Sequence, residues 1–513
     1  MDTKDKNNES EENKSNESEE NKLDLIKSNP AENKYEPVIG LEAHVELCTR
    51  TKMFCGCMLS FGEDKNIYTC PVCLGHPGSL PVTNRKAVQY ATKIALALHC
   101  KIQDYTIFHR KNYFYPDMPK NYQISQYDLP LGVKGHLDVD MGDYTRRVGI
   151  TRVHMEEDTG KLLHTGTTGR ISESEASIVD FNRAGTPLIE VVTEPDIRSP
   201  EEAREYMIAL RNLILFLDVS NCSMEEGSLR CDANVSVRKK GSEKIGTKTE
   251  IKNLNSFKFL QKGLEYEVER QIKTLEAGNK VIQQTRHYDS KTATTKVLRS
   301  KEEAHDYRYF PEPDLVPIYM EGKMVEDIKK TIPELPAAKA KRFEKQYGLS
   351  TYDSNFLAND RNLADYFEKC RSCYGNAKNI ANWVMGDFSA LLNKEKMTIK
   401  ESRVTPENLC KMLEIIDGGK INSKMAKAVF EEMFATGKDP RKIIEERGLE
   451  QIADEGMLET VIEEVIRDNP GPVEQFKQGK EKALSFLIGK VMAKTKGKAN
   501  PRMVNEIMTK KLS

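Results

Sequence analysis

The chain has 513 residues, a formal net charge of −1 and eleven cysteines. This length predicts two to four domains with sizeable cores. The near-zero charge excludes a protein that binds polyanions over its whole surface, and an odd number of cysteines excludes complete disulfide pairing. No apolar run approaches the roughly 20 residues of a membrane span. The N-terminus is charged from Asp2 and lacks a signal-peptide core, so we expect a cytoplasmic protein without membrane contact.

Residues 1–34 are polar and contain a repeat. The heptapeptide Asn-Glu-Ser-Glu-Glu-Asn-Lys occurs at 8–14 and again at 16–22. Residues 1–22 hold eight acids and four lysines, which gives a net charge of −4. Such a segment cannot bury enough apolar surface to offset its chain entropy. The sequence therefore predicts a disordered acidic tail over residues 1–34.

Residues 35–325 are expected to form one domain of strands with interspersed helices. Ser199, Pro200 and Glu202 provide the N-cap, first-turn proline and capping-box glutamate of a helix. Apolar residues at helical spacing follow them: Tyr206, Leu210, Leu213, Ile214 and Leu217. The predicted strands are Val38–Leu47, Arg147–Met155, Pro187–Thr193, Leu229–Val237 and Thr247–Lys252.

After about residue 330 the strand patterns end. Thr405 and Pro406 start a helix that Gly418 ends. We therefore expect residues 326–440 to form a helical domain and residues 441–513 to form a small helical tail domain. The fold class is therefore α+β. Residues 471–513 hold ten Lys or Arg and three Glu, a net charge of +7. This charge suits a phosphate backbone, but an ordinary solvated helical face explains it equally well.

Four cysteines have the spacing of a metal site. Cys55 and Cys57 form one pair, and after twelve intervening residues Cys70 and Cys73 form a second. Two short knuckles match tetrahedral zinc, and four thiolates leave no open position, so the site would be structural. Free or disulfide-forming cysteines are the alternative. The Cys370–Cys373 pair has no matching second pair and is expected at a helix surface or in a core.

Acidic residues recur along the predicted strands. Glu42, His44 and Glu46 share one strand face, because alternate residues of a strand point the same way. Further acids stand at 156–158, 190, 225–226 and 232. Carboxylates suit Mg²⁺, which in turn suits nucleotide phosphates, whereas plain solvent exposure is the alternative.

Basic residues lie near these acids in the sequence. Arg183, Arg230 and Lys252 can hold phosphate oxygens or form ion pairs with the carboxylates, and the sequence leaves both readings open. It contains no Walker A motif, dinucleotide-binding fingerprint or kinase signature. Bound ATP would therefore need a metal site on the sheet.

At these motifs the chain closely resembles the B subunits of the glutamyl/aspartyl-tRNA amidotransferases. The resemblance runs from about residue 36 to the end, and the N-terminal repeat lies outside it. The matching stretches are Val38–His44, Arg110–Asp117, His154–Asp158, Asn182–Glu190, Met224–Asn234, Lys252–Ser256 and Asp306–Asp314.

The resemblance implies a cradle-like catalytic domain with an antiparallel sheet, followed by helical and tRNA-binding tail domains. It implies that ATP phosphorylates the side-chain carboxylate of glutamate on the glutamine tRNA or of aspartate on the asparagine tRNA, and that ammonia then displaces phosphate. The implied Mg²⁺ ligands are His44, Glu157 and Glu190, with Glu42 at the reaction centre and Glu156 and Asp232 as further catalytic candidates. Arg183, Arg230 and Lys252 would hold phosphates. The four cysteines match the zinc-bearing form of the family.

The sequence shows neither a serine amidase signature nor a cysteine–histidine glutaminase motif. The resemblance implies that a separate amidase, the A subunit, supplies ammonia, that a small C subunit joins the two, and that misacylated tRNA is the substrate. A free-standing ligase for small carboxylates, or a non-catalytic tRNA scaffold, is the competing interpretation. The sequence does not identify which misacylated tRNA is used.

Overall fold

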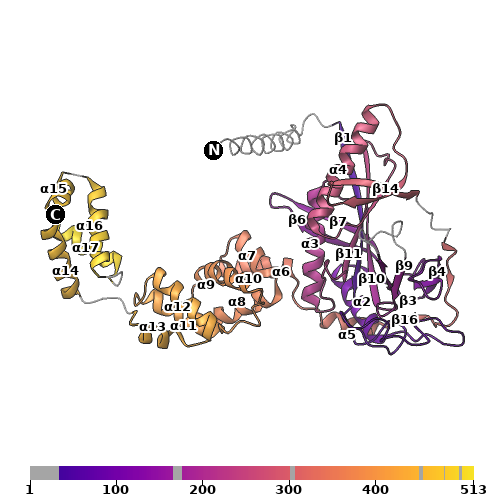
Figure 1. Ribbon diagram of the computed structural model, residues 1–513, viewed down its shortest axis with the longest axis horizontal. Helices are drawn as coiled ribbons and strands as arrows, with labels where there is room; N and C mark the ends of the chain where they lie inside the picture. The colour runs from indigo at the N-terminus through magenta and orange to yellow at the C-terminus, as the bar shows by residue number, and fades with distance from the viewer. Residues whose placement is uncertain are drawn as a thin grey trace, which may run out of the picture. The chain divides into compact units, whose positions relative to one another are not determined.

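The computed structural model describes residues 34–165, 176–300, 307–449, 455–478, 480–495 and 499–512. The chain divides into two compact units, Met1–Pro333 and Glu334–Ser513. In Figure 1 the described part of the first unit combines strands and helices, and that of the second is helical. The predicted α+β class is thus confirmed. The predicted tail, apart from Lys34, lies outside the described residues.

A nine-stranded sheet forms the centre of the first unit, in the order β14-β13-β12-β11-β1-β10-β7-β6-β2. Neighbouring strands are antiparallel except β12 and β13, which α4 (Phe257–Glu276) connects and which run parallel; a parallel pair requires such a long crossover. The strands are β1 (Tyr35–Glu46), β2 (Lys101–Ile102), β6 (Gly132–Asp140), β7 (Thr145–Glu157), β10 (Pro187–Thr193), β11 (Leu229–Lys239), β12 (Thr249–Lys252), β13 (Gln284–Asp289) and β14 (Thr294–Ser300).

The five predicted strands are all present in this sheet. β10 has the predicted bounds, and the others differ at their ends, where pairing with neighbours extends or shortens the ladder. The predicted alternation along β1 is also confirmed. Leu41, Ala43 and Val45 are at most 1% exposed, whereas Glu42 and His44 on the other face are partly exposed.

Three helices cover the apolar face of the sheet: α2 (Arg85–Ala97), α3 (Pro200–Leu217) and α4. α2 packs on β7, α3 on β1 and β6, and α4 on β11. As predicted, Ser199 caps α3, accepting a hydrogen bond from the Glu202 amide at 3.1 Å, and Tyr206, Leu210 and Ile214 are fully buried. Among the described residues, these helices leave the opposite, acidic face of the sheet without helical cover.

Short strands form smaller sheets beside the large one. A three-stranded sheet has the order β15-β4-β5, and two-stranded sheets pair β16 with β3 and β8 with β9. β5 packs against β7 and so brings this small sheet to the acidic face. The strands are β3 (Tyr105–Thr106), β4 (His109–Asn112), β5 (Tyr122–Ser125), β8 (Lys161–Thr165), β9 (Ala176–Asp180), β15 (Phe310–Pro311) and β16 (Ile318–Tyr319).

The second unit contains two separate hydrophobic cores. The first includes Ile443 and Ile444 of α13, and the second begins at Leu458 of α14. α5 (Gly322–Lys330) precedes this unit and packs on α2. The helices of the second unit are α6 (Pro336–Tyr347), α7 (Thr351–Ala358), α8 (Arg361–Cys373), α9 (Ala377–Trp383), η4 (Val384–Phe388), α10 (Ser389–Glu395), α11 (Pro406–Asp417), α12 (Ser423–Thr436), α13 (Pro440–Arg447), α14 (Glu455–Asp468), α15 (Pro470–Lys477), α16 (Glu481–Lys494) and α17 (Pro501–Leu512).

A disulfide joins two helices of the second unit. Cys373 at the end of α8 is bonded to Cys410 of α11, with 6.3 Å between their Cα atoms. Cys370 is buried in the core, as expected. The sequence did not predict the disulfide, because Cys410 lies 37 residues away and outside any motif. Among the described helices none is both long and apolar enough to span a membrane.

Candidate active site

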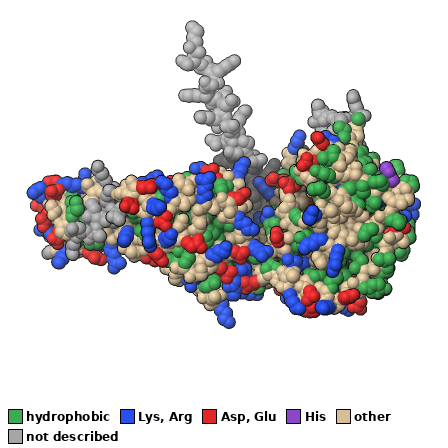
Figure 2. Space-filling model, turned by 90° about the horizontal axis from the view of Figure 1, so that it is seen from below, with side chains coloured by type: hydrophobic (Ala, Val, Ile, Leu, Met, Phe, Trp, Pro, Cys, Tyr) green, Lys and Arg blue, Asp and Glu red, His purple; other side chains and the backbone are tan. Residues whose placement is uncertain are grey.

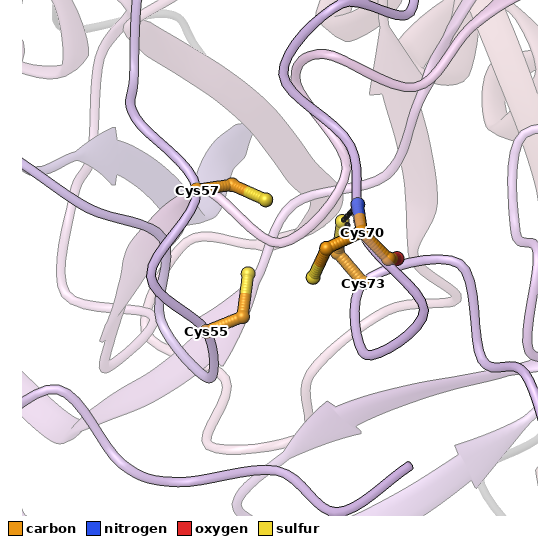
Figure 3. Close-up of side chains that lie close together, drawn as sticks. All are labelled: Cys55, Cys57, Cys70 and Cys73. Carbon is orange, nitrogen blue, oxygen red and sulfur yellow. Dashed lines mark hydrogen bonds between the residues drawn. The ribbon is translucent and has the colours of Figure 1, made fainter.

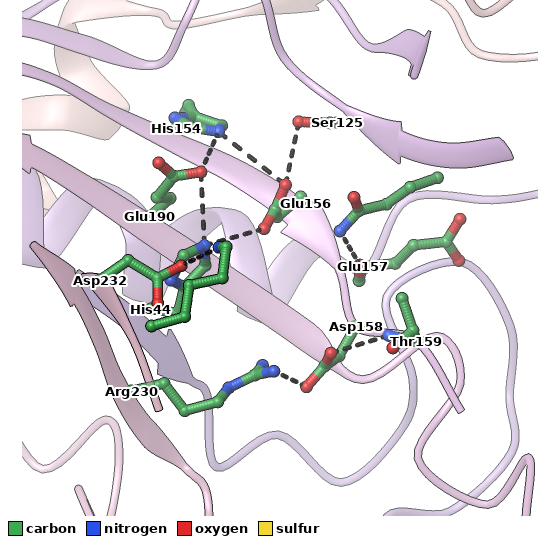
Figure 4. A network of polar contacts seen from close by, with 12 residues as sticks. His44, Ser125, His154, Glu156, Glu157, Asp158, Thr159, Glu190, Arg230 and Asp232 are labelled. Carbon is green, nitrogen blue, oxygen red and sulfur yellow. Dashed lines mark hydrogen bonds and ion pairs between the residues drawn. The ribbon is translucent and has the colours of Figure 1, made fainter. Parts of the chain in front are cut away.

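Strand pairing places four charged or ionisable side chains in one row across the acidic face. On β1, His44 lies opposite Arg230 of β11 on one side and Glu190 of β10 on the other. Glu190 in turn lies opposite His154 of β7. Directly paired residues share a face of the sheet. The row therefore runs over four adjacent strands, and Figure 4 shows its side chains close together.

A histidine and two carboxylates converge at this row, because Glu156, two residues after His154 on β7, reaches it from the same face. His44 Nε2 lies 3.6 Å from Glu190 Oε2 and 3.8 Å from Glu156 Oε1. The ligand atoms of these three residues all lie within 4.8 Å of one another. Ser125 donates a hydrogen bond to Glu156 at 3.2 Å, and His154 Nε2 lies 3.2 Å from Glu190 Oε2. One nitrogen and two carboxylates, oriented by neighbours, are a donor set that fits a divalent cation.

The electrostatics of the group show how strongly it attracts positive charge. Burial by itself would lower the pKa of His44, but the Glu190 carboxylate raises it to about 9. Burial would raise the pKa of Glu190, yet His154 and His44 hold it well below its usual range. In the absence of a cation, a protonated imidazole therefore balances these acids. A metal ion would take over this role and bind neutral imidazole.

Glu157, predicted as the third ligand, does not lie with His44 and Glu190. Successive residues of a strand point to opposite faces, so Glu156 reaches the acidic face and Glu157 the other face of β7, as Figure 4 shows. There the Glu157 carboxylate is paired with Lys120 and accepts a hydrogen bond from the Ile124 amide at 2.9 Å. In this structure Glu156 occupies the place expected for Glu157.

The other predicted catalytic residues form a second row, two positions along the strands. Glu42 of β1 lies opposite Asp232 of β11, and Asn234 donates a hydrogen bond to Glu42 at 2.9 Å. Lys252 is ion-paired with Asp232. Burial, and then the charges of Glu190 and two other acids, raise the pKa of Glu42. The structure thus brings Glu42, Asp232 and Lys252 together, beside the His44 group.

Arg183 and Arg230 meet at Asp158, just beyond the end of β7. Arg230 is ion-paired with Asp158, and Arg183 Nε lies 3.6 Å from the same carboxylate. Arg183 also donates hydrogen bonds to the carbonyls of Thr159 and Gly160 at 3.0 and 2.8 Å. In this structure each of the three predicted phosphate-holding residues is paired with a carboxylate, so the ion pairs considered from the sequence are present.

Besides Ser125 and Asn234, three residues near the site were not assigned roles from the sequence. His154 and Asp158 stand in a motif that the sequence singled out, but their partners depend on the pairing of distant strands. Lys111 of β4 is the third. Burial would lower the pKa of the Lys111 ammonium, but the negative charges of Glu156 and, to a smaller extent, Glu190 raise it. Its sequence signal is its place in the matching stretch Arg110–Asp117.

The four predicted zinc ligands lie together on two loops. Figure 3 shows the sulfurs of Cys55 and Cys57 facing those of Cys70 and Cys73, and all four lie within 4.8 Å of one another. A tetrahedral site with Zn–S bonds of about 2.3 Å has sulfurs about 3.8 Å apart. The cluster therefore fits one zinc ion. Lys52, which is fully buried, has its Nζ 3.6 Å from Cys73 Sγ.

Comparisons with known proteins match both units. Residues 37–326 match the GatB/GatE catalytic domain, and residues 365–512 match the GatB domain. A protein of Carboxydothermus hydrogenoformans, named as the B subunit of aspartyl/glutamyl-tRNA(Asn/Gln) amidotransferase, is 56% identical over 94% of this chain and 99% of its own length. Proteins of the same name from Caldanaerobacter subterraneus and Geotalea daltonii are 54% and 52% identical over 94% and 93% of this chain and 100% and 99% of their own lengths.

The acidic sheet therefore lies in a catalytic domain of the amidotransferase class, a class of ligases. The chain belongs to the GatB family of amidotransferase B subunits. The resemblance found in the sequence and the predicted enzyme class are both confirmed.

Proposed function

We propose that this chain activates the side-chain carboxylate of glutamyl-tRNA(Gln), aspartyl-tRNA(Asn) or both. ATP phosphorylates the carboxylate, and ammonia then displaces phosphate to give the amide. A free carboxylate is a poor acyl donor to ammonia until one of its oxygens becomes part of a leaving group, so phosphorylation solves the chemical problem. The relatives' names supply the substrates, and the observation that carries the proposal is the convergence of His44, Glu156 and Glu190 on one face of the sheet.

His44, Glu156 and Glu190 are the residues proposed to hold Mg²⁺. An ion bound to these residues would neutralise the charge on phosphate oxygens and so favour attack by the substrate carboxylate. His154 orients Glu190 through the 3.2 Å contact, and Ser125 orients Glu156. This choice retains two of the ligands expected from the resemblance and takes Glu156 as the third, since Glu157 points away.

Phosphate oxygens are proposed to lie near Arg183, Arg230 and Lys252. On phosphate binding, each side chain would exchange some of its present contacts with Asp158 or Asp232 for the ligand. A groove next to this cluster is lined by Glu46, Asn182 and Arg183 and also carries Lys65 and Lys161. Its basic residues and its position beside the carboxylates make it suitable for a nucleotide. Glu42 is proposed to face the reacting carboxylate.

Ammonia is proposed to come from a partner amidase, the A subunit, with a small C subunit completing the complex. The chain lacks motifs for glutamine hydrolysis, and its relatives are named as subunits. The zinc ion proposed for the cysteine cluster is structural. A free-standing ligase for small carboxylates gains no support, because the match to tRNA amidotransferase subunits includes the helical unit.

The test is ATP hydrolysis by the assembled enzyme with charged and uncharged tRNA. With ammonium as nitrogen source, we expect charged tRNA to stimulate phosphate release and amide formation together. Glu190→Gln should abolish both while the partner's glutaminase activity survives. Glutamine-dependent amide formation by the isolated chain, or ATP hydrolysis indifferent to charged tRNA, would contradict the proposal.

A further inference from the structure

The loop between the two cysteine pairs is hydrogen-bonded to the segment that carries Arg183. Asn66, in this loop, accepts a hydrogen bond from the Phe181 amide at 2.7 Å through Oδ1 and donates one to the Val179 carbonyl at 3.0 Å through Nδ2. Its own amide donates to Asp180 at 3.2 Å. One asparagine therefore pairs with the chain at 179 and 181 much as a neighbouring strand would.

A second set of hydrogen bonds runs between the same two segments. Asn182 accepts a hydrogen bond from the Tyr68 amide at 2.9 Å and donates one to the Asp64 carbonyl at 2.7 Å. Asn66 and Asn182 thus each use both ends of their amide side chain across the contact. Asn66 has a φ of 62°, a left-handed conformation that asparagine adopts more readily than most residues. These features indicate a specific pairing of two loops.

Lys52 connects the cysteine cluster itself to this segment. Its Nζ lies 3.6 Å from Cys73 Sγ and donates a hydrogen bond to the Phe181 carbonyl at 3.1 Å. A buried ammonium requires compensating negative charge, and a zinc ion with four thiolates carries a net charge of −2. Metal loading would therefore hold Lys52, and through it Phe181, in place.

The segment that is hydrogen-bonded to the cysteine loop, residues 179–182, leads directly into the proposed phosphate site. Arg183 is the next residue after Asn182, and two residues later Gly185 donates a hydrogen bond to the Asp158 carbonyl at 2.9 Å. The Met53 amide, next to Lys52, donates to the Gly185 carbonyl at 2.7 Å. Movement of the cysteine loop would thus displace Arg183 relative to Asp158 and Arg230.

We infer that the metal-closed cysteine loop positions Arg183 for phosphate binding and that Asn66 is the positioning residue which couples the two. The inference rests on the proposed function, because it gives the structural metal a task in the ATP-dependent step. Asn66 itself touches no reacting group. Its effect is transmitted through residues 179–183.

Amide hydrogen exchange in the assembled enzyme tests the coupling without reference to activity. Asn66→Gly removes the side-chain hydrogen bonds to Phe181 and Val179. Glycine readily adopts the positive φ of residue 66. We expect the Phe181 amide to exchange about tenfold faster, as for loss of one hydrogen bond. Lys134→Gly is the matched control, since Lys134 is exposed, also has a positive φ (56°) and lies on β6. It should leave residues 179–183 unchanged. Asn182→Ala is the second variant and should accelerate exchange at Tyr68.

Removal of zinc by a chelator, followed by return to Mg²⁺, is the second arm. We expect the same faster exchange at 179–183 and a KM for ATP raised about tenfold, the scale found for outer-shell partners. Asn66→Gly should raise this KM similarly, and zinc removal from that variant should add little, because both act through one contact. Unchanged exchange at 179–183 after both perturbations would overturn the inference.

Arg183→Ala separates this inference from the proposed function. If that variant binds ATP normally while Asn66→Gly still accelerates exchange at 179–183, the phosphate role proposed for Arg183 is wrong, and only the coupling of the cysteine loop to residues 179–183 is supported. If Arg183→Ala loses ATP binding while Asn66→Gly and zinc removal leave exchange and KM unchanged, the proposed function is supported. The coupling of the cysteine loop to Arg183 through Asn66 is then wrong.

Discussion

Two adjacent glutamates on β7 have opposite surroundings. Glu156 lies near His44 and His154, while Glu157 is paired with Lys120 and lines a pocket that Cys55 and Cys73 also line. Both are at most 3% exposed, so burial does not distinguish them. The strand alternation does, because only every second side chain reaches the acidic face.

We therefore predict different metal affinities for two matched variants. Glu156→Gln removes a proposed ligand and should weaken Mn²⁺ binding about tenfold or more. Glu157→Gln keeps the acidic face intact, so the Mn²⁺ affinity should change by less than about twofold. Titration of the free Mn²⁺ signal by electron paramagnetic resonance measures both. Equal weakening in the two variants would show that the face assignment is wrong.

The site shows how far sequence reasoning reaches at the level of residues. Alternation along one strand correctly placed Glu42, His44 and Glu46 on one face and Leu41 and Val45 on the other. It could not place His154 opposite Glu190, because that register depends on pairing between strands far apart in the sequence. The metal role of Glu157 came from resemblance alone and stays a prediction. The same alternation, applied to β7, places Glu156 and not Glu157 on the face of His154.

Among the elements, the sequence predicted β1, β7, β10, β11 and the short β12, but neither β6, β13 and β14 of the same sheet nor the two-residue strands. β1, β7, β10 and β11 have enough residues for an alternating pattern. β3, β15 and β16 have two residues each, which is too few for any periodicity. These short strands are fixed by distant partners, as when Phe310 of β15 pairs with Arg110 of β4. The sequence therefore identified five of the nine strands of the large sheet. It missed the other four and the small sheet that brings Lys111 and Ser125 to the site.

The two cysteine loops are predicted to depend on one zinc ion. Metal analysis of the purified protein should find about one zinc per chain, as for a site with four thiolates. Cys70→Ser combined with Cys73→Ser should reduce this to background, because two of four ligands are lost. Cys100→Ser is the control, since Cys100 is a buried thiol outside the cluster. Zinc retained by the double variant would refute the assignment.

Over the whole molecule, the basic C-terminal helices are partly neutralised by their neighbour. α14 carries five acids and one arginine, a net charge of −4, against +7 for residues 471–513. Lys494 is paired with Glu464 at 2.7 Å and Lys511 with Glu463 at 2.6 Å. Figure 2 likewise shows acidic and basic side chains interspersed over the helical unit. Lysines that are not paired with α14 are therefore the better candidates for phosphate contacts.

Deleting the basic segment is a poor test of its role. Leu458, Ile462 and Val465 of α14 belong to the same core as Leu487 and Val504. Removal of residues 471–513 would expose them and confuse loss of tRNA binding with loss of folding. Point variants of surface lysines avoid this difficulty.

We predict that Lys477, Lys482 and Lys510 contribute to tRNA affinity. All three are exposed and have no ion-pair partner within the described part of the chain. Their combined replacement by Ala should weaken binding of charged tRNA and reduce the slope of log affinity against log salt by roughly 0.7 to 0.9 for each phosphate that is no longer bound. Lys494→Ala with Lys511→Ala is the matched control, in which the loss should be smaller because those lysines already pair with α14. Filter binding across a salt series, with ATP hydrolysis in the absence of tRNA as a check on the catalytic unit, measures both. An unchanged salt slope in the triple variant would show that these helices do not bind tRNA phosphates through these lysines.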